Sequence, residues 1–158
     1  SYNYNLDETA RQWLKAQGMN ITGTPNGIVW GTKISSSYAT TGVIIGFASP
    51  NFLEYSGLSD NEAITFNLLN GTVKSVETVL TTTAGGNNSS STVIMDAFDT
   101  TGNLVVSGSK TFTGITNGIY TPARINVTSS SSNIAKFTLR TTQYPYDGIY
   151  VEDVKSCN

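Results

Sequence analysis

The sequence predicts an all-β protein: an antiparallel β-sandwich or barrel, with one short N-terminal α-helix. Three observations predict it. Short apolar or alternating segments recur along the chain, and turn signals separate them about every 8–12 residues, which is the spacing of sandwiches and barrels. Only one segment has helical periodicity. The 158 residues suffice for one domain that buries roughly two thirds of its unfolded surface.

The chain opens with a segment that we separate from the sandwich: residues 1–18 form an N-terminal arm and helix, and residues 19–158 the β-sandwich domain. Tyr2, Tyr4 and Leu6 alternate with polar residues, which is the pattern of a short amphipathic strand. Such a strand could pair with the open edge of another sandwich.

The helix follows this strand. Asp7 is a suitable N-cap, and Gly18 is suited to end the helix. Trp13 and Leu14 lie on one face at helical spacing. This face either caps one end of the sandwich or docks on a neighbouring subunit, and the sequence leaves both possibilities open.

From residue 19 onward the pattern predicts strands only. Asn70-Gly71 and Asn117-Gly118 are hairpin-turn signals, and Asp99 to Asn103 is another tight turn. Residues 84–91 form a polar loop of low complexity. The expected strands span residues 19–22, 28–30, 42–47, 63–69, 73–83, 92–98, 104–106, 110–115, 120–128, 134–142 and 148–154.

The last strand contains two acids, Glu152 and Asp153, although acids are depleted in strands. They could bind a cation, accept hydrogen bonds from a loop, or face water. Strict alternation places Asp153 on the side of Ile149 and Val151, so we expect Asp153 to be the more buried acid.

Composition excludes several classes of function. Only 13% of the residues are charged, and the net charge is -2. The absence of a basic stripe argues against a nucleic-acid partner. The sequence contains no run of eighteen apolar residues, so it does not predict insertion into a membrane. The chain has no histidine, which removes the usual general base and every Ser-His or Cys-His dyad.

We therefore expect that the protein is not an enzyme. Phosphate-loop, zinc and Gly-x-Ser-x-Gly motifs are absent from the sequence. A glycosidase would need two carboxylates across a cleft. The candidates besides the closing pair are Glu54, Asp60, Glu62, Asp96 and Asp99. Asp60 and Glu62 sit in an expected loop and Asp99 in a turn, where acidic residues are ordinary.

Two kinds of modification are conceivable. The single cysteine, Cys157, is either an inert thiol or half of an intermolecular bridge. Five Asn-x-Ser/Thr triplets are possible N-glycosylation sites, and they begin at Asn20, Asn70, Asn87, Asn88 and Asn126.

Several short stretches are similar to the motifs of one group of β-sandwich domains. The segment from Ile34 through Tyr38 to Gly42-Val43 is similar to an I-x-x-x-Y-x-x-x-G-V opening. Residues 97–105 look like an A-x-D-x-x-G-x-x-V hairpin, and residues 148–154 like a closing G-I-x-I-D-D-V strand. These stretches resemble extracellular jelly-roll domains of the carbohydrate-binding-module and secreted bacterial surface-protein type. The resemblance spans about residues 19–154 and implies an antiparallel two-sheet β-sandwich of jelly-roll type, outside the cell or at its surface.

The resemblance also implies a possible structural calcium ion, since closing acids of such jelly-rolls often bind one. The expected ligands are Asp153, Glu152 and Asp147, whose hard oxygen atoms suit calcium. The alternative is that Asp153 accepts backbone N–H bonds and is purely structural.

Two functions remain open. The first is a non-catalytic extracellular structural or adhesive subunit whose partners are copies of itself. It would self-associate through Tyr2, Tyr4, Leu6, Trp13 and Leu14.

The alternative is a carbohydrate-binding module that recognises extracellular glycans through aromatic side chains, because the C–H faces of sugars stack on flat rings. The candidates are Tyr144, Tyr146, Trp30 and Tyr38, with Tyr120 as a further aromatic. An ice-binding surface is a minor option, for which the threonines lack regular spacing on one face.

Overall fold

The computed structural model describes residues 8–23, 28–32, 44–48, 63–82, 90–116, 119–141 and 149–158. They form one helix and twelve strands. In chain order these are α1 (Glu8–Ala16), β1 (Met19–Gly23), β2 (Ile28–Thr32), β3 (Ile44–Ala48), β4 (Ile64–Leu68), β5 (Ser75–Thr82), β6 (Ser91–Phe98), β7 (Leu104–Phe112), β8 (Ile115–Thr116), β9 (Ile119–Tyr120), β10 (Ala123–Thr128), β11 (Lys136–Thr141) and β12 (Ile149–Cys157).

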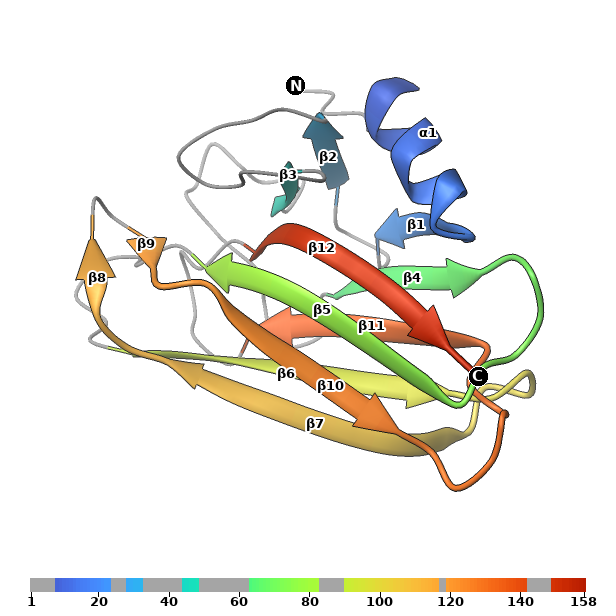
Figure 1. The fold of residues 1–158 in the computed structure, drawn as a ribbon. Coiled ribbons are helices and arrows are strands. Elements are labelled where there is room, and N and C mark those ends of the chain that lie inside the picture. The colour runs from blue at the N-terminus through green and yellow to red at the C-terminus, as the bar shows by residue number, and fades with distance from the viewer. Residues whose placement is uncertain are drawn as a thin grey trace.

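The strands build the predicted antiparallel β-sandwich. A five-stranded sheet has the order β1-β4-β11-β6-β7, and a three-stranded sheet has the order β10-β5-β12. In Figure 1 the three-stranded sheet crosses in front of the larger one. β2 and β3 form a two-stranded sheet, and β3 contacts β12. β8 and β9 form another two-stranded sheet. All strand pairs among the described residues are antiparallel.

Alternation of side chains makes the core between the sheets. In β6 every second residue is buried, from Ser91 to Ala97. Phe66 of β4 stands opposite Phe137 of β11, and their rings stack with centroids 4.7 Å apart. Both are fully buried. The three-stranded sheet contributes a second set of buried side chains: Val76, Leu80, Ile125, Val127, Val151 and Val154.

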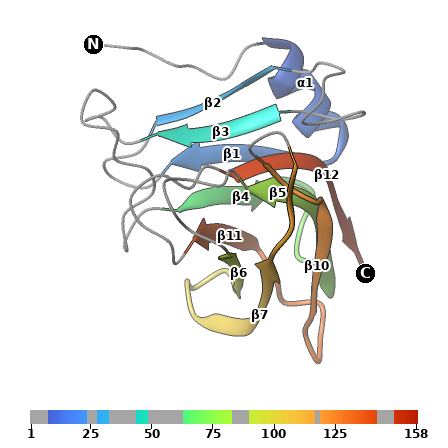
Figure 2. The same ribbon diagram turned by 90° about the vertical axis from the view of Figure 1, so that its left-hand side faces the viewer.

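Helix α1 packs on this core. Leu14 is only 1% exposed, and Trp13 is packed against the buried cluster. Figure 2 shows α1 at the end of the molecule where the β2-β3 pair lies, in keeping with its contacts to β1 and β2. Of the two possibilities for this helix face, capping one end of the sandwich is therefore the one that the structure shows.

Gly18 ends the helix as predicted. Its φ is 77°, and its carbonyl accepts a 2.8 Å hydrogen bond from the backbone N–H of Leu69. A Cβ atom built on Gly18 would lie 2.8 Å from Nδ2 of Asn70. The positive φ and this close approach favour glycine at the end of the helix, and the turn ties α1 to the end of β4.

The turn at Asp99 is the β6–β7 hairpin, also as predicted. Oδ1 of Asp99 accepts hydrogen bonds from the backbone N–H and the hydroxyl of Thr101, at 2.9 and 2.7 Å, and from the N–H of Asn103 at 3.0 Å. The hydroxyl of Thr101, followed by the other bonds, lowers the pKa of Asp99 below its ordinary value.

The expectation for Asn70-Gly71 was wrong. These residues do not make a hairpin, because β4 pairs with β1 and β11 whereas β5 pairs with β10 and β12. The turn carries the chain from one sheet to the other. Ile134 is fully buried and makes a separate bridge to Val73 before β11 begins.

The alternation expected for the closing strand also fails. The register of β12 against β5 shifts between Val151 and Asp153, so a β-bulge breaks the alternation. Val151 and Val154 are both buried, and Asp153 stands opposite Val79 and is half-buried. Asp153 therefore does not share the side of Val151.

Thr78 offers a test of the core. Its side chain is 1% exposed, and its hydroxyl has no hydrogen-bond partner in the described part of the chain. A buried, unpaired hydroxyl is costly. Thr78→Val should raise the free energy of unfolding by about 1–2 kcal/mol in urea denaturation. Thr65→Val, on the outward side of β4, should change it little; equal effects would contradict this account.

Gly18→Ala tests the helix end. Positive φ costs an L-residue roughly 1–2 kcal/mol, and the clash with Asn70 adds to it. Gly102→Ala is the matched control, because Gly102 has a φ of 86° but open space around its Cβ position. Thermal melts should show the larger loss for Gly18→Ala. Equal losses would mean that the close approach to Asn70 is unimportant.

Asp99→Asn tests the hairpin turn. Because the pKa of Asp99 is lowered on folding, its ionised form stabilises the protein above the ordinary value of 3.8, and this stabilisation is lost as pH falls through the folded pKa. The variant should therefore be less stable than the wild type at neutral pH. The difference in melting temperature should shrink below the ordinary pKa; a constant difference would exclude this linkage.

Candidate functional site

The outward side of the five-stranded sheet, which we name the polar face, is the candidate functional site. Because Val93, Met95 and Ala97 of β6 point into the core, the residues between them point outward. The strand register extends this side to the neighbouring strands. The polar face comprises Asn20, Thr65, Asn67, Thr92, Ile94, Asp96, Phe98, Leu104, Ser107, Ser109, Thr111, Lys136, Thr138 and Arg140.

Asp96 is at the centre of the polar face. Oδ1 of Asp96 accepts a 2.6 Å hydrogen bond from the hydroxyl of Ser107, and Oδ2 accepts a 3.1 Å bond from Nε of Arg140. Thr138 of β11 stands directly opposite Asp96. The Asp96 side chain is 15% exposed and the Arg140 side chain 36%. Three adjacent strands thus hold a carboxylate, a guanidinium and a hydroxyl in one cluster.

Further hydrogen bonds join side chains of neighbouring strands on the polar face. Nδ2 of Asn67 donates to Oδ1 of Asn20 at 2.9 Å, and the hydroxyls of Thr92 and Thr111 are 2.9 Å apart.

At one end of the face the ammonium of Lys136 lies 5.7 Å from the centre of the Phe98 ring. Leu104, opposite Phe98 in the register, is 58% exposed. The face therefore offers hydrogen-bonding groups beside an apolar corner.

The outward side of the three-stranded sheet is different. Oε1 of Glu77 lies 2.9 Å from Nε of Arg124 and 3.4 Å from Nζ of Lys155. Arg124 is 64% exposed and Lys155 58%. These are solvent-exposed ion pairs of the ordinary surface kind.

The residues that the sequence singled out are only partly described. Tyr2, Tyr4, Leu6, Tyr38, Tyr144, Tyr146 and Asp147 lie outside the described residues, as do Asn87 and Asn88. Trp30 and Tyr120 belong to β2 and β9, and Glu152 to β12, but the structure describes only their backbone. Asn20, Asn70 and Asn126 are exposed, and Cys157 is an exposed free thiol.

The calcium prediction gains no support from Asp153. Its Oδ1 accepts a 2.9 Å hydrogen bond from the backbone N–H of Val154, so the donor is its own neighbour and not another loop. The described residues include no group of three acidic, cysteine or histidine side chains that could hold a metal ion. Calcium binding remains a prediction.

Sequence reasoning considered Asp96 only as a catalytic carboxylate and did not connect it with Arg140. The alternation in residues 92–98 and 136–141 places both side chains outward. Their pairing across 44 positions depends on the β6–β11 register, which no local signal specifies.

Comparisons with known proteins support the fold. No protein-family model matches the chain, and no curated protein matches it. Among solved structures, TmCBM61 in complex with beta-1,4-galactotriose is similar with a TM-score of 0.50 and 16% sequence identity, over 98% of this chain and 97% of that one. The structural similarity confirms a β-sandwich like that of carbohydrate-binding modules.

A second similar structure belongs to a longer protein, the arabinose-bound MgGH51 α-L-arabinofuranosidase. The TM-score is 0.54 and the identity 13%, over 85% of this chain. The chain spans only 23% of the length of that enzyme, and the likeness concerns the fold.

In the described residues, no helix is long and apolar enough to cross a membrane.

Proposed function

We propose that this protein is a non-catalytic glycan-binding module that acts outside the cell or at its surface, and that it binds through the polar face. The observation that carries the proposal is the Asp96–Arg140–Ser107 cluster at the centre of the five-stranded sheet. This function is the carbohydrate-binding alternative drawn from the sequence. The proposed binding residues are those of the polar face and differ from the aromatic residues that the sequence suggested.

The chemistry of the polar face suits a sugar. Hydroxyl groups both donate and accept hydrogen bonds, so they pair with a carboxylate on one side and with a guanidinium on the other. Nε of Arg140 already donates to Asp96, and the two terminal Nη groups are the remaining donors. The exposed Leu104 and the ring of Phe98 offer apolar surface for sugar C–H groups.

The position of the cluster adds to the proposal. Its residues stand on paired strands, so the backbone fixes their spacing before a ligand arrives, which lowers the entropy cost of binding. A solved structure with a similar fold, TmCBM61, holds a β-1,4-galactotriose. This makes a neutral oligosaccharide a reasonable first ligand to test.

Fewer of the described residues support the other hypotheses, which are self-association, glycan recognition by aromatic side chains and calcium binding. Self-association through residues 1–18 loses Leu14 as a contact residue, because Leu14 is buried in the protein's own core. Glycan recognition by Tyr144, Tyr146, Trp30 and Tyr38 stays a prediction about side chains outside the described ones. A structural calcium ion at Asp153, Glu152 and Asp147 also stays a prediction, because the structure describes the side chain of Asp153 but not those of Glu152 and Asp147.

Arg140→Ala tests the proposal. Once a glycan array has identified a ligand, titration calorimetry should show that the variant binds it at least about tenfold more weakly, since a hydrogen bond to a charged group contributes roughly 1.5–3 kcal/mol.

Arg124→Ala is the matched control, because Arg124 also donates through Nε to a strand carboxylate but lies on the other sheet. Its affinity should equal that of the wild type. An empty array at high protein concentration would refute glycan binding. Loss of binding in Tyr146→Ala with none in Arg140→Ala would move the site to the loop aromatics.

A further inference from the structure

A pocket of about 290 Å³ lies between the helix and the first strand, outside the Asp96 cluster. We name it the helix pocket. Its volume is at the lower end of the range for ligand sites and suits a ligand of monosaccharide size. Three parts of the chain line it: Arg11, Gln12, Leu14 and Lys15 of α1, Met19, Asn20 and Ile21 of β1, and Leu69 after β4.

Two cations stand at this pocket without a described counter-ion. Arg11 and Lys15 are four positions apart and therefore neighbours on the helix surface, where like charges repel each other and destabilise a helix. The ion pairs of the described residues all involve Glu77 or Asp96. The charged side chains in the described lining of the helix pocket are therefore both cations, in a chain whose net charge is -2.

The rest of the pocket is apolar with amide groups. Leu14 and Met19 are each 1% exposed and form a fixed floor. Leu69 is 48% exposed, one of two large hydrophobic side chains in the described residues that are exposed. Oδ1 of Asn20 accepts a hydrogen bond from Nδ2 of Asn67. The Nδ2 group of Asn20 is not used in this bond and can donate to a ligand.

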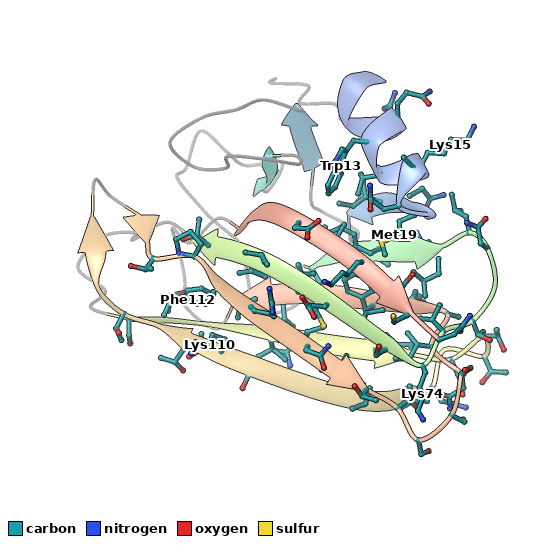
Figure 3. The ribbon with its side chains drawn as sticks, in the orientation of Figure 1. Trp13, Lys15, Met19, Lys74, Lys110 and Phe112 are labelled. Atoms are coloured by element: carbon teal, nitrogen blue, oxygen red, sulfur yellow. The ribbon has the colours of Figure 1, made fainter. Side chains whose placement is uncertain are left out.

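Figure 3 shows how these parts are arranged. Trp13 lies on the side of α1 that faces the sandwich, and Lys15 extends from the other side. Met19 lies below the helix, where β1 begins. Arg11 and Lys15 line the pocket and are exposed, whereas Leu14 and Met19 of the same lining are buried.

We propose that the helix pocket binds a sugar acid, that is, a monosaccharide unit carrying a carboxylate. Arg11 and Lys15 pair with the carboxylate, and the planar guanidinium of Arg11 can do so with two parallel hydrogen bonds. The Asn20 amide binds ring hydroxyls, and Leu69 and Ile21 contact the C–H groups. This site shares only Asn20 with the polar face and does not depend on glycan binding there, so either can fail alone.

The test is an NMR titration of the ¹⁵N-labelled protein with D-glucuronate, with D-glucose and inorganic sulfate as separate arms. Glucuronate should shift the backbone amide signals of Gly18, Asn20 and Leu69 in a saturable way. Arg11→Ala and Lys15→Ala should each weaken this binding by about tenfold, and added salt should weaken it as well.

Two further variants distinguish the helix pocket from the polar face and from diffuse charge attraction. Lys74→Ala removes an exposed lysine that does not line the helix pocket and lies beside Cys157 (Figure 3), and Arg140→Ala disrupts the polar face. Both should bind glucuronate as the wild type does, and melting curves should show that all four variants stay folded.

The proposal is overturned if glucuronate causes no saturable shifts, or if glucose binds equally well, since the carboxylate would then be unimportant. It is also overturned if sulfate binds as tightly as glucuronate, because the site would then hold any small anion. Equal weakening by Lys74→Ala would indicate diffuse charge attraction and no pocket.

Discussion

The register of β4, β11 and β6 is the constraint on which the rest of the structure depends. Phe66 and Phe137 stack across two of these strands, and Leu139 faces Met95 across the next pair, all of them buried. Because successive side chains of a strand alternate between the two sides of the sheet, this buried pairing also fixes which side chains stand next to one another on the polar face. A slip of one residue would expose the core and destroy the polar cluster at the same time. Core and candidate site are therefore two sides of the same register.

The helix is part of that structure. Leu14 completes the buried cluster at one end of the sandwich, and Gly18 connects α1 to β4 through Leu69. The same arrangement leaves Arg11 and Lys15 at the rim of a pocket whose floor is the core itself. A segment that sequence reasoning set apart for contact with other copies thus has a role within its own domain.

Local patterns predicted much of the fold. Alternation identified β4 and β6, and turn residues identified the hairpin at Asp99 and the helix end at Gly18. Failures occurred where pairing is long-range. The Asn70-Gly71 signal fits a hairpin, but the partners of β4 and β5 lie elsewhere in the chain. The bulge in β12 reversed the expected facing of Asp153. The Asp96–Arg140 pair needed a register that only the folded sheet supplies.

The central claim is that the outward side of this register binds a glycan. The most direct measurement is a crystal structure of the protein with the oligosaccharide that it binds best. The account predicts density for the sugar over β6 and β11, with its hydroxyls within hydrogen-bond distance of Asp96 and Arg140. Density beside the Glu77 ion pairs, or over the Tyr144–Tyr146 loop with the polar face empty, would contradict it.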